Sequence, residues 1–555
     1  MSQPQDQHAD CDVLVVGFGG AGACAAIEAH DAGARMVIVE RFTGGGATAR
    51  SGGVVYIGGC SPSQRRAGWD DSVDAMYGYL REETEDAVSE ATLRAFCERS
   101  LDNAAWLEAQ GARFTLPFFA AKTTQPPDGY GLYWSGNEKQ RAHAAKPAPR
   151  GHVVDGDGMT GHVLFAALAE AVARRGIEVR RHTGAQSLVV SGDGTVVGVE
   201  LLSLPASQPL RAAHLGLKGV FEALRSARSK RAERARETLE AFERRWGRAS
   251  RIHVRGGVVL ASGGFVFNQA LLRERAPRYA ECMPLGTAGD DGAAIRLGEA
   301  VGAVSGETER CAASRFIAPP EAFVTGALVD GTGRRFCDET LYGATLSKAI
   351  SERPGGVAYV ITDAAIRSRA EQQMKQEERV RDFTLGQLAA GHANHLLFRN
   401  YCYLTNRHVN RRRAPTLEAL EQALAMPPGV LVAAIREYND AIASGRPDAF
   451  GKARESCAPL LVPPFDAFDC SLDSALFPGP CLTLGGLRVD GLRGRALRAD
   501  GSEIPGLYAA GRSAVGVASR SYVSGLSLAD CVFSGRNAGR DAAERAAHAS
   551  AGLRR

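Results

Sequence analysis

A phenol and a hydroxyl group stand two residues apart in the last part of the chain, at Tyr522 and Ser524. They lie in a run of small residues, Gly511 to Asp530, which follows an apolar stretch at 507–510 and leads into a helical pattern. A strand-to-helix crossing of this kind leaves backbone N–H groups without partners inside the helix. We therefore expect chemistry at this crossing, with a cofactor bound by another part of the chain.

The amino-terminal segment predicts that cofactor, because an apolar strand at 11–16 runs into a glycine turn and an alanine-rich helix. In a βαβ unit Gly17 makes the tight turn, Gly19 lets the backbone approach a pyrophosphate, and Gly22 allows close helix packing. The phosphate then rests on the helix N-terminus. Glu40, after the second strand, is expected to accept hydrogen bonds from ribose hydroxyls. The expected contacts of this unit are Gly17, Gly19, Gly20, Ala21, Gly22, Glu40 and Arg41.

A second glycine-rich segment, at 44–53, follows directly. Small residues let a backbone lie flat against an extended dinucleotide, and the hydroxyls of this segment can reach its phosphates and ring. The alternative is a flexible loop without a ligand. The expected contacts here are Gly45, Gly46, Ala47, Thr48, Ser51, Gly52 and Gly53.

Composition indicates a globular enzyme, because 555 residues that are 45% hydrophobic can bury a large core in two domains. The formal charge of +4 against 66 basic and 62 acidic residues gives no field for collecting nucleic acid. The 12 cysteines form no Cys-x-x-Cys pair, so we expect reduced thiols and no zinc site. Without a leader pattern in the first ten residues or a long apolar run, a cytoplasmic location is expected.

Changes in the sequence pattern along the chain suggest where domains begin and end. Residues 9–280 are expected to form the first part of a cofactor-binding domain, 281–466 a substrate domain, and 467–555 the last part of the cofactor domain. Residues 203–250 are a basic insertion whose apolar residues recur at helical spacing, which predicts a helical hairpin. Its polar side is either a solvated face or a contact with an anionic membrane surface.

The glycine turn, the 44–53 loop and the closing strands at 482–490 and 504–512 together resemble the fumarate reductase and succinate dehydrogenase flavoprotein superfamily. The resemblance implies FAD and an α/β fold, with a Rossmann-like FAD-binding domain of the glutathione-reductase type and an inserted α+β substrate-capping domain. No histidine occurs in the 44–53 loop, so the FAD is expected to be non-covalent. The resemblance adds expected FAD contacts at Gly263, Asp291, Gly511, Arg512, Gly525, Ser527 and Leu528.

The passage before the last helix bears on the substrate. Fumarate reductases need a histidine and an arginine there, where this chain has Ala518 and Tyr522. Two dicarboxylate charges would be left desolvated and without cations, which is costly. The passage instead resembles the 3-ketosteroid dehydrogenases, especially the Δ4-(5α) type. The runs that carry this resemblance are 522–525, 149–152, 133–138 and 339–343.

The resemblance implies roles for three side chains. Tyr522 is expected to donate a hydrogen bond to the ketone oxygen, where charge develops. Ser524 and Tyr342 are expected to carry away the C4 proton while FAD takes the C5 hydride. Tyr401 or Tyr403 could replace Tyr342, because the preceding loop varies in length. His152, which has no partner in the sequence, favours a structural role over a catalytic one.

Other functions stay open at this point. The alternatives are Δ1-dehydrogenation of a 3-ketosteroid, an FAD-dependent enone or fumarate-type reductase, and a flavin-binding assembly or regulatory protein without turnover. The expected partners are a 3-ketosteroid substrate and an external electron acceptor such as a quinone. Peripheral membrane contact through residues 203–250 is the further possibility.

Overall fold

The computed structural model describes residues 10–552, except 122, 124, 141–144, 226–229, 316, 319, 377–399, 402 and 475–478. Its largest sheet runs in the order β20-β21-β10-β1-β2-β7. The strands are β1 (Cys11–Val16), β2 (Met36–Glu40), β7 (Glu178–Arg181), β10 (Arg248–Leu260), β20 (Arg495–Leu497) and β21 (Glu503–Ala509). The neighbours from β21 to β7 are parallel, whereas β20 is antiparallel to β21. The near-continuous burial of β1 and β2 is typical of parallel strands covered on both faces.

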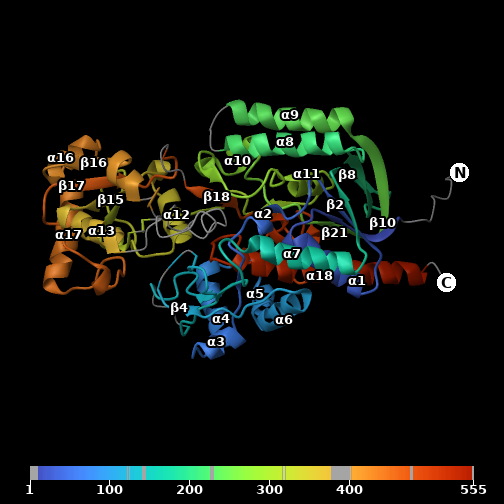
Figure 1. Ribbon diagram of the computed structural model, residues 1–555, viewed down its shortest axis with the longest axis horizontal. Coiled ribbons are helices and arrows are strands. Elements are labelled where there is room, and N and C mark those ends of the chain that lie inside the picture. The colour runs from blue at the N-terminus through green and yellow to red at the C-terminus, as the bar shows by residue number, and fades with distance from the viewer. Residues whose placement is uncertain are drawn as a thin grey trace.

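Two helices from opposite ends of the chain cover one face of this sheet. α1 (Gly20–Asp31) packs along α18 (Leu526–Gly552). A Cβ atom at Gly535 would lie 2.5 Å from the Ala21 carbonyl oxygen, and one at Gly539 would lie 2.2 Å from that of Ala25. Glycine is therefore required on α18 for the backbones to approach this closely. Figure 1 shows α18 in red beneath the sheet, beside α1. α7 (Gly161–Arg174) packs against α1.

A second lobe lies at the left of Figure 1, in yellow and orange. Its sheet has the order β14-β15-β17-β16, formed by β14 (Ala327–Asp330), β15 (Ala358–Thr362), β16 (Arg411–Ala414) and β17 (Phe465–Asp469). The helices around it are α12 (Gly343–Ser351), α13 (Ala364–Gln376), α16 (Leu417–Ala423) and α17 (Val430–Ser444). A small sheet, β11 (Met283–Pro284), β18 (Pro480–Thr483) and β13 (Cys311–Ala313), lies where the chain passes between the lobes. The exact domain limits at 281 and 466 stay a prediction.

A third group of elements carries Tyr133. It has a sheet in the order β3-β6-β5-β4, formed by β3 (Val54–Tyr56), β4 (Phe118–Phe119), β5 (Leu132–Tyr133) and β6 (Gly151–Val153). The helices beside it are α4 (Val73–Thr84), α5 (Glu90–Glu98) and α6 (Ser100–Gln110). β3 also contacts α18, so this small sheet lies beside the start of the last helix.

The basic insertion forms two helices, α8 (Gln208–Leu224) and α9 (Lys230–Trp246), as its periodicity predicted. It leaves the sheet between β9 (Val196–Ser203) and β10, and β9 also pairs with β8 (Thr183–Val190). The two helices lie together as a green pair at the top of Figure 1. No helix among the described residues is long and apolar enough to cross a membrane.

Candidate cofactor and active site

A cavity of about 980 Å³ opens at the carboxyl ends of β1, β2 and β10. This is the edge at which a doubly wound sheet binds its ligands. Most of the predicted cofactor contacts line it: Gly17, Gly19, Gly20, Ala21, Glu40, Arg41, Gly46, Ala47, Thr48, Ser51, Gly52, Gly263, Asp291, Arg512, Ser527 and Leu528. Tyr522 lines it as well, so the structure joins the cofactor segments at the amino terminus to the predicted reaction site.

Five of the predicted contacts lie outside the lining: Gly22, Gly45, Gly53, Gly511 and Gly525. Their positions explain why glycine is present. A Cβ atom at Gly22 would lie 2.0 Å from the Gly17 carbonyl oxygen. Gly525 has a φ of +85°, and a Cβ atom there would lie 2.8 Å from the Tyr56 nitrogen. These two glycines shape the turns around the cavity, and their contact with the cofactor stays a prediction.

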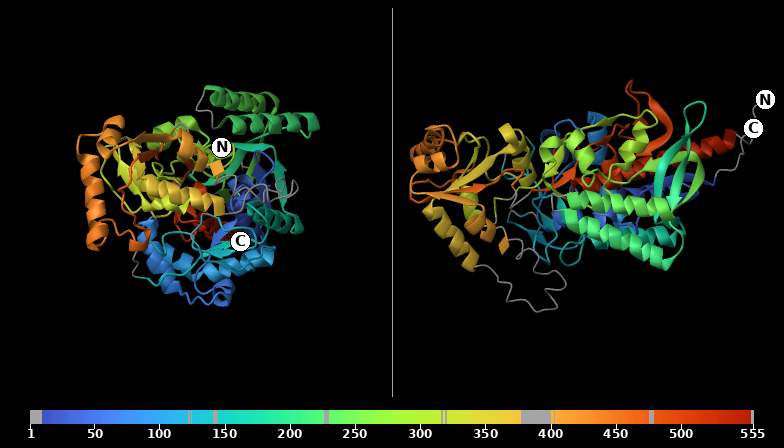
Figure 2. Two further views of the ribbon diagram at one scale, coloured as in Figure 1. Left: turned by 60° about the vertical axis from the view of Figure 1, so that its left-hand side comes forward. Right: turned by 90° about the horizontal axis from the view of Figure 1, so that it is seen from above.

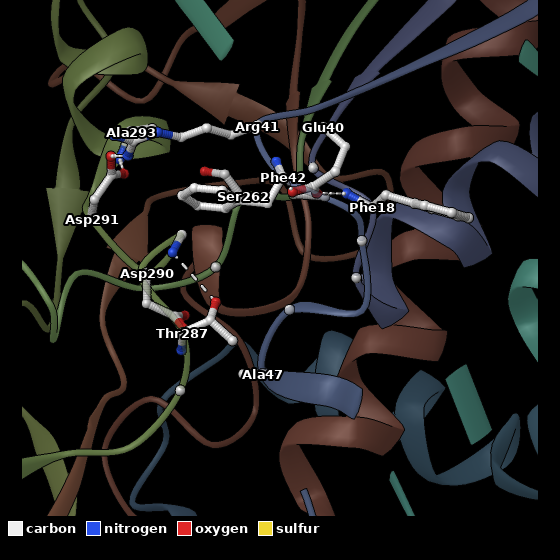
Figure 3. A pocket seen from close by; sticks show the side chains of 18 of the residues that line it. Phe18, Glu40, Arg41, Phe42, Ala47, Ser262, Thr287, Asp290, Asp291 and Ala293 are labelled. Atoms are coloured by element: carbon white, nitrogen blue, oxygen red, sulfur yellow. Dashed lines mark hydrogen bonds and ion pairs between the residues drawn. The ribbon is translucent and has the colours of Figure 1, made fainter. Parts of the chain in front are cut away.

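The Glu40 carboxylate is fixed by two backbone donors at the end of β2. It accepts hydrogen bonds from the N–H groups of Phe18, at 2.9 Å, and Phe42, at 2.8 Å. Figure 3 shows the carboxylate between these two residues. A carboxylate has about four lone-pair sites, so Glu40 keeps acceptor capacity for the ribose hydroxyls that the sequence assigned to it.

The cavity offers several groups that suit an anionic dinucleotide. The N-cap of α1, Gly19, has no side chain to cap the helix, and the Gly20 N–H donates to Thr48 Oγ1 at 3.0 Å. The helix N-terminus, which lines the cavity, still favours a phosphate there. The Arg512 guanidinium donates through Nη2 to Asp290, at 2.6 Å, whereas its buried Nη1 has no partner among the described residues. The buried Ser262 hydroxyl in the cavity wall is also without one. A ligand carrying phosphate or ring acceptors would satisfy these donors, so the residues present fit FAD.

Four hydroxyl groups gather beside the start of α18. Ser524 Oγ lies 2.9 Å from the phenol oxygen of Tyr133, and both side chains are buried. Burial raises the pKa of Tyr133, Tyr342 and Tyr522 above the ordinary value. For Tyr342 the neighbouring Tyr522 and Tyr133 raise the pKa further, while a hydrogen bond with Ser524 opposes the rise. All three phenols therefore stay protonated near neutral pH and act as neutral donors.

The backbone of residues 133–138 positions this hydroxyl cluster, which is Tyr133, Tyr342, Tyr522 and Ser524. The Ser524 N–H donates to the Ser135 carbonyl oxygen at 3.1 Å. The Asn137 side chain accepts a hydrogen bond from the Tyr342 N–H at 2.7 Å. Asn137 also donates to Glu83 and to Thr345, each at 2.8 Å. One loop thus holds two segments that are distant in the sequence.

The other predicted candidates lie elsewhere. The Tyr403 phenol accepts a hydrogen bond from Arg407, and Tyr401 is half exposed. His152 is buried, with Nε2 at 2.7 Å from Ser61 Oγ and Nδ1 at 2.9 Å from the Arg150 carbonyl oxygen. Burial lowers the pKa of His152 to about 4, so the ring is neutral, and a structural role fits this geometry.

Two parts of the site were not found from the sequence. Tyr133 was noticed only as part of the 133–138 run that carries the resemblance, without a role of its own, and nothing local links it to Ser524. The insertion also contributes to the cavity through His214, Lys218, Arg225, Glu240 and Glu243. The two roles predicted for the insertion, a solvated face and a membrane contact, did not include a side that lines the cavity. The amphipathic period of the insertion was the available signal, because it requires an apolar partner surface.

Comparison with known proteins bears on the cofactor. Residues 12–528 match the family described as FAD binding domain. The chain belongs to this FAD-binding family. It is also 35% identical over 511 residues to the 3-oxo-5-alpha-steroid 4-dehydrogenase of Comamonas testosteroni, which covers 90% of this chain and 92% of that protein. The chain described in this structure is therefore a flavoprotein and an FAD-dependent oxidoreductase.

Solved structures agree with this flavoprotein fold. The 3-ketosteroid-Δ4-(5α)-dehydrogenase of Rhodococcus jostii RHA1, solved with 4-androstene-3,17-dione, has a TM-score of 0.77 and 29% identity, covering 98% of this chain and 99% of that one. The 3-ketosteroid Δ1-dehydrogenase of Sterolibacterium denitrificans has a TM-score of 0.65 and 20% identity, covering 96% of this chain and 99% of that one. The second likeness shows the fold alone. The predicted fold class of the flavoprotein is confirmed.

Proposed function

We propose that this flavoprotein introduces a C4–C5 double bond into a 3-ketosteroid. The observation that carries the proposal is the hydroxyl cluster, in which Ser524 contacts Tyr133 and Tyr342 beside Tyr522 at the cavity wall. Protonated phenols suit a neutral ketone. The passage before α18 has Ala518 and Tyr522 at the two positions where a fumarate reductase needs the histidine and the arginine for its dicarboxylate. The steroid 4-dehydrogenase relatives support the same substrate class.

The side chains divide the reaction between them. The Tyr522 phenol donates a hydrogen bond to the C3 ketone oxygen and stabilises the charge that develops there as C4 loses its proton. Ser524 Oγ accepts that proton as it passes its own to Tyr342 or Tyr133, and that phenol in turn releases its own proton, so one proton leaves to water. FAD, held non-covalently in the cavity, would supply the acceptor for the hydride that leaves C5. Loss of a proton and a hydride from neighbouring carbons leaves the C4–C5 double bond and a two-electron-reduced cofactor.

Anaerobic titration of the flavin tests this function. We expect a saturated 5α-3-ketosteroid to bleach the yellow flavin and to yield a Δ4 product, with a 5β-3-ketosteroid as the comparison. Product analysis separates Δ4 from Δ1 dehydrogenation. Failure of every saturated 3-ketosteroid to reduce the flavin would contradict the proposal. Reoxidation of chemically reduced protein by an enone, in that case, would favour a reductase.

The predicted domain at 281–466 is proposed to cap the substrate over the flavin. Pro284, Leu285, Thr287 and Asp290 from this segment line the cavity. They face the glycine turn and the 44–53 loop of the FAD-binding part, so the two segments enclose one space. Steroid-dependent protection of residues 284–290 from hydrogen exchange would be the expected sign of this role.

The electrons are proposed to leave through an external acceptor such as a quinone. Peripheral membrane contact through residues 203–250 would bring the protein to such an acceptor. Leu215, Val220 and Trp246 of this segment are exposed apolar side chains, at 36%, 53% and 44%. Sedimentation with anionic vesicles should fall when Val220 and Trp246 are changed to Ser. Equal sedimentation of this variant and the original protein would remove the membrane role.

A further inference from the structure

The helical hairpin α8–α9 is an insertion that leaves the sheet and returns to it at one position. Ser203, at the end of β9, pairs directly with Arg248, at the start of β10, so the whole insertion begins and ends at one rung of the ladder. The hairpin packs inward through His214, whose ring stacks on Phe42 at 5.1 Å and on Phe242 at 6.3 Å. Figures 1 and 2 show the two helices side by side along the edge of the FAD-binding part.

Glu222 on α8 joins the two walls of the cofactor cavity. Its Oε2 binds the Arg50 guanidinium, at the end of the 44–53 loop. Its Oε1 accepts a hydrogen bond from the Ala288 N–H at 2.9 Å, in the segment that forms the facing wall. Lys218, one turn earlier on α8, lies 3.1 Å from the same oxygen. The carboxylate is buried, which raises its pKa, but the hydrogen bond from the Ala288 N–H and the charges of Lys218 and Arg50 outweigh burial and lower the pKa.

Glu243 on α9 makes a second tie, at the end of β2. It binds Arg41 through two hydrogen bonds, at 2.8 and 2.9 Å, and Arg41 Nη1 in turn binds Asp291 at 2.8 Å. His214 Nε2 lies 2.7 Å from the same carboxylate. Figure 3 shows Arg41 and Asp291 on one side of the cavity, beside Phe42. Because Arg41 and Asp291 both line the cavity, α9 is tied to both of its walls.

We propose that the hairpin α8–α9 is a strap that closes over the bound FAD and retains it, with Glu222 and Glu243 as its two ties. The inner side of the strap presents Lys218, Arg225, Arg236 and Arg244 to the cavity, together with Glu240 and Glu243. Glu222 pairs with Lys218, and Glu240 pairs with Arg236, so the basic excess that faces an anionic dinucleotide is small. Each tie crosses from the insertion to segments on either side of the cofactor. FAD therefore leaves only when the ties open.

A strap of this kind affects the rate of FAD release more than it affects the steroid reaction. Breaking one tie lets the hairpin lift from the cavity more often, so the dissociation rate rises. We expect Glu222→Gln to release FAD about tenfold faster, because an amide cannot pair with Arg50 and Lys218 as a carboxylate does. Glu243→Gln should act in the same direction through Arg41.

The test measures release of FAD from the purified holoprotein after dilution, by separating free from bound flavin over time. Glu237→Gln is the matched control, because Glu237 lies on the exposed side of α9. A variant in which residues 205–246 are replaced by a short turn should release FAD fastest. Circular dichroism of each variant shows whether it has folded.

Release by both single variants within twofold of the original protein would overturn the proposal, whether or not the shortened chain folds. The readout does not depend on steroid turnover. If the protein fails to oxidise ketosteroids, release of FAD can still depend on the strap. The proposed function and the proposed strap can therefore fail separately.

Discussion

Ser524 Oγ lies 2.9 Å from the Tyr133 phenol oxygen, although 391 residues separate the two in the chain. Tyr133 lies on β5 of the β3-β6-β5-β4 sheet, whereas Ser524 precedes α18 of the FAD-binding part. Their contact places a second phenol beside the hydroxyl that we assign to the C4 proton. The proposed reaction site thus lies where two parts of the fold meet.

Tyr522→Phe should slow reduction of the flavin by a 3-ketosteroid by about 10²–10³-fold, the usual effect of losing one oxyanion donor. The phenyl ring keeps its packing, so flavin content should not change. Anaerobic stopped-flow reduction at saturating steroid measures the effect. A loss of less than threefold would remove Tyr522 from this role.

The two possible exits for the proton can be separated by single substitutions. Tyr342→Phe should slow flavin reduction by about 10²-fold, as expected for loss of a general acid–base partner. Tyr133→Phe, which leaves Ser524 in place, should slow it by less than tenfold. The measurement is the same stopped-flow reduction, together with its solvent deuterium isotope effect. A larger loss for Tyr133→Phe would assign the relay to Tyr133.

His152 should make the protein less stable as the pH falls. Its pKa is lowered from 6.5 to about 4 by burial, so the unfolded state binds the proton first. The stability held above pH 6.5 is lost as the pH falls toward 4, by up to about 3 kcal/mol. Urea unfolding at several pH values measures this loss, and His152→Gln should flatten the profile. His253→Gln, at an exposed position of β10, should leave it unchanged.

Asp530 should have the opposite pH dependence. Burial raises its pKa from 3.8 to about 7, against a backbone hydrogen bond with Val517 that lowers it. The native state then holds a proton that the unfolded state has lost, so stability present below pH 3.8 is lost as the pH rises through 7. The full difference corresponds to about 4 kcal/mol.

Asp530→Asn tests this directly, because the amide oxygen can still accept from the Val517 N–H. The variant should match the original protein at pH 4 and exceed its stability at pH 8. Thermal unfolding at both values measures the difference. Glu544→Gln, exposed on the same helix, is the control. Equal stability of Asp530→Asn and the original protein at pH 8 would contradict the raised pKa.

The cofactor half of the site was predictable from the sequence because its geometry is local. Gly17, Gly22 and Glu40 lie within one βαβ unit, and turn sterics require glycine at the first two. The hydroxyl cluster was only partly predictable. Tyr522 and Ser524 share one turn, whereas Tyr133 reaches them through tertiary packing that no local pattern encodes. The inner face of the hairpin was hidden for the same reason, since periodicity shows that a face is buried and not what it covers.

The packing of α1 against α18 has a consequence for biosynthesis. The cavity takes walls from β1 and α1, made early, and from Arg512, Ser527 and Leu528, made near the end. Gly535 and Gly539 then bring α18 against the helix on which the phosphate is expected to rest. An amino-terminal segment emerging from the ribosome carries the fingerprint but lacks the cavity walls that the later segments supply. We therefore expect stable FAD binding only after α18 has been synthesised.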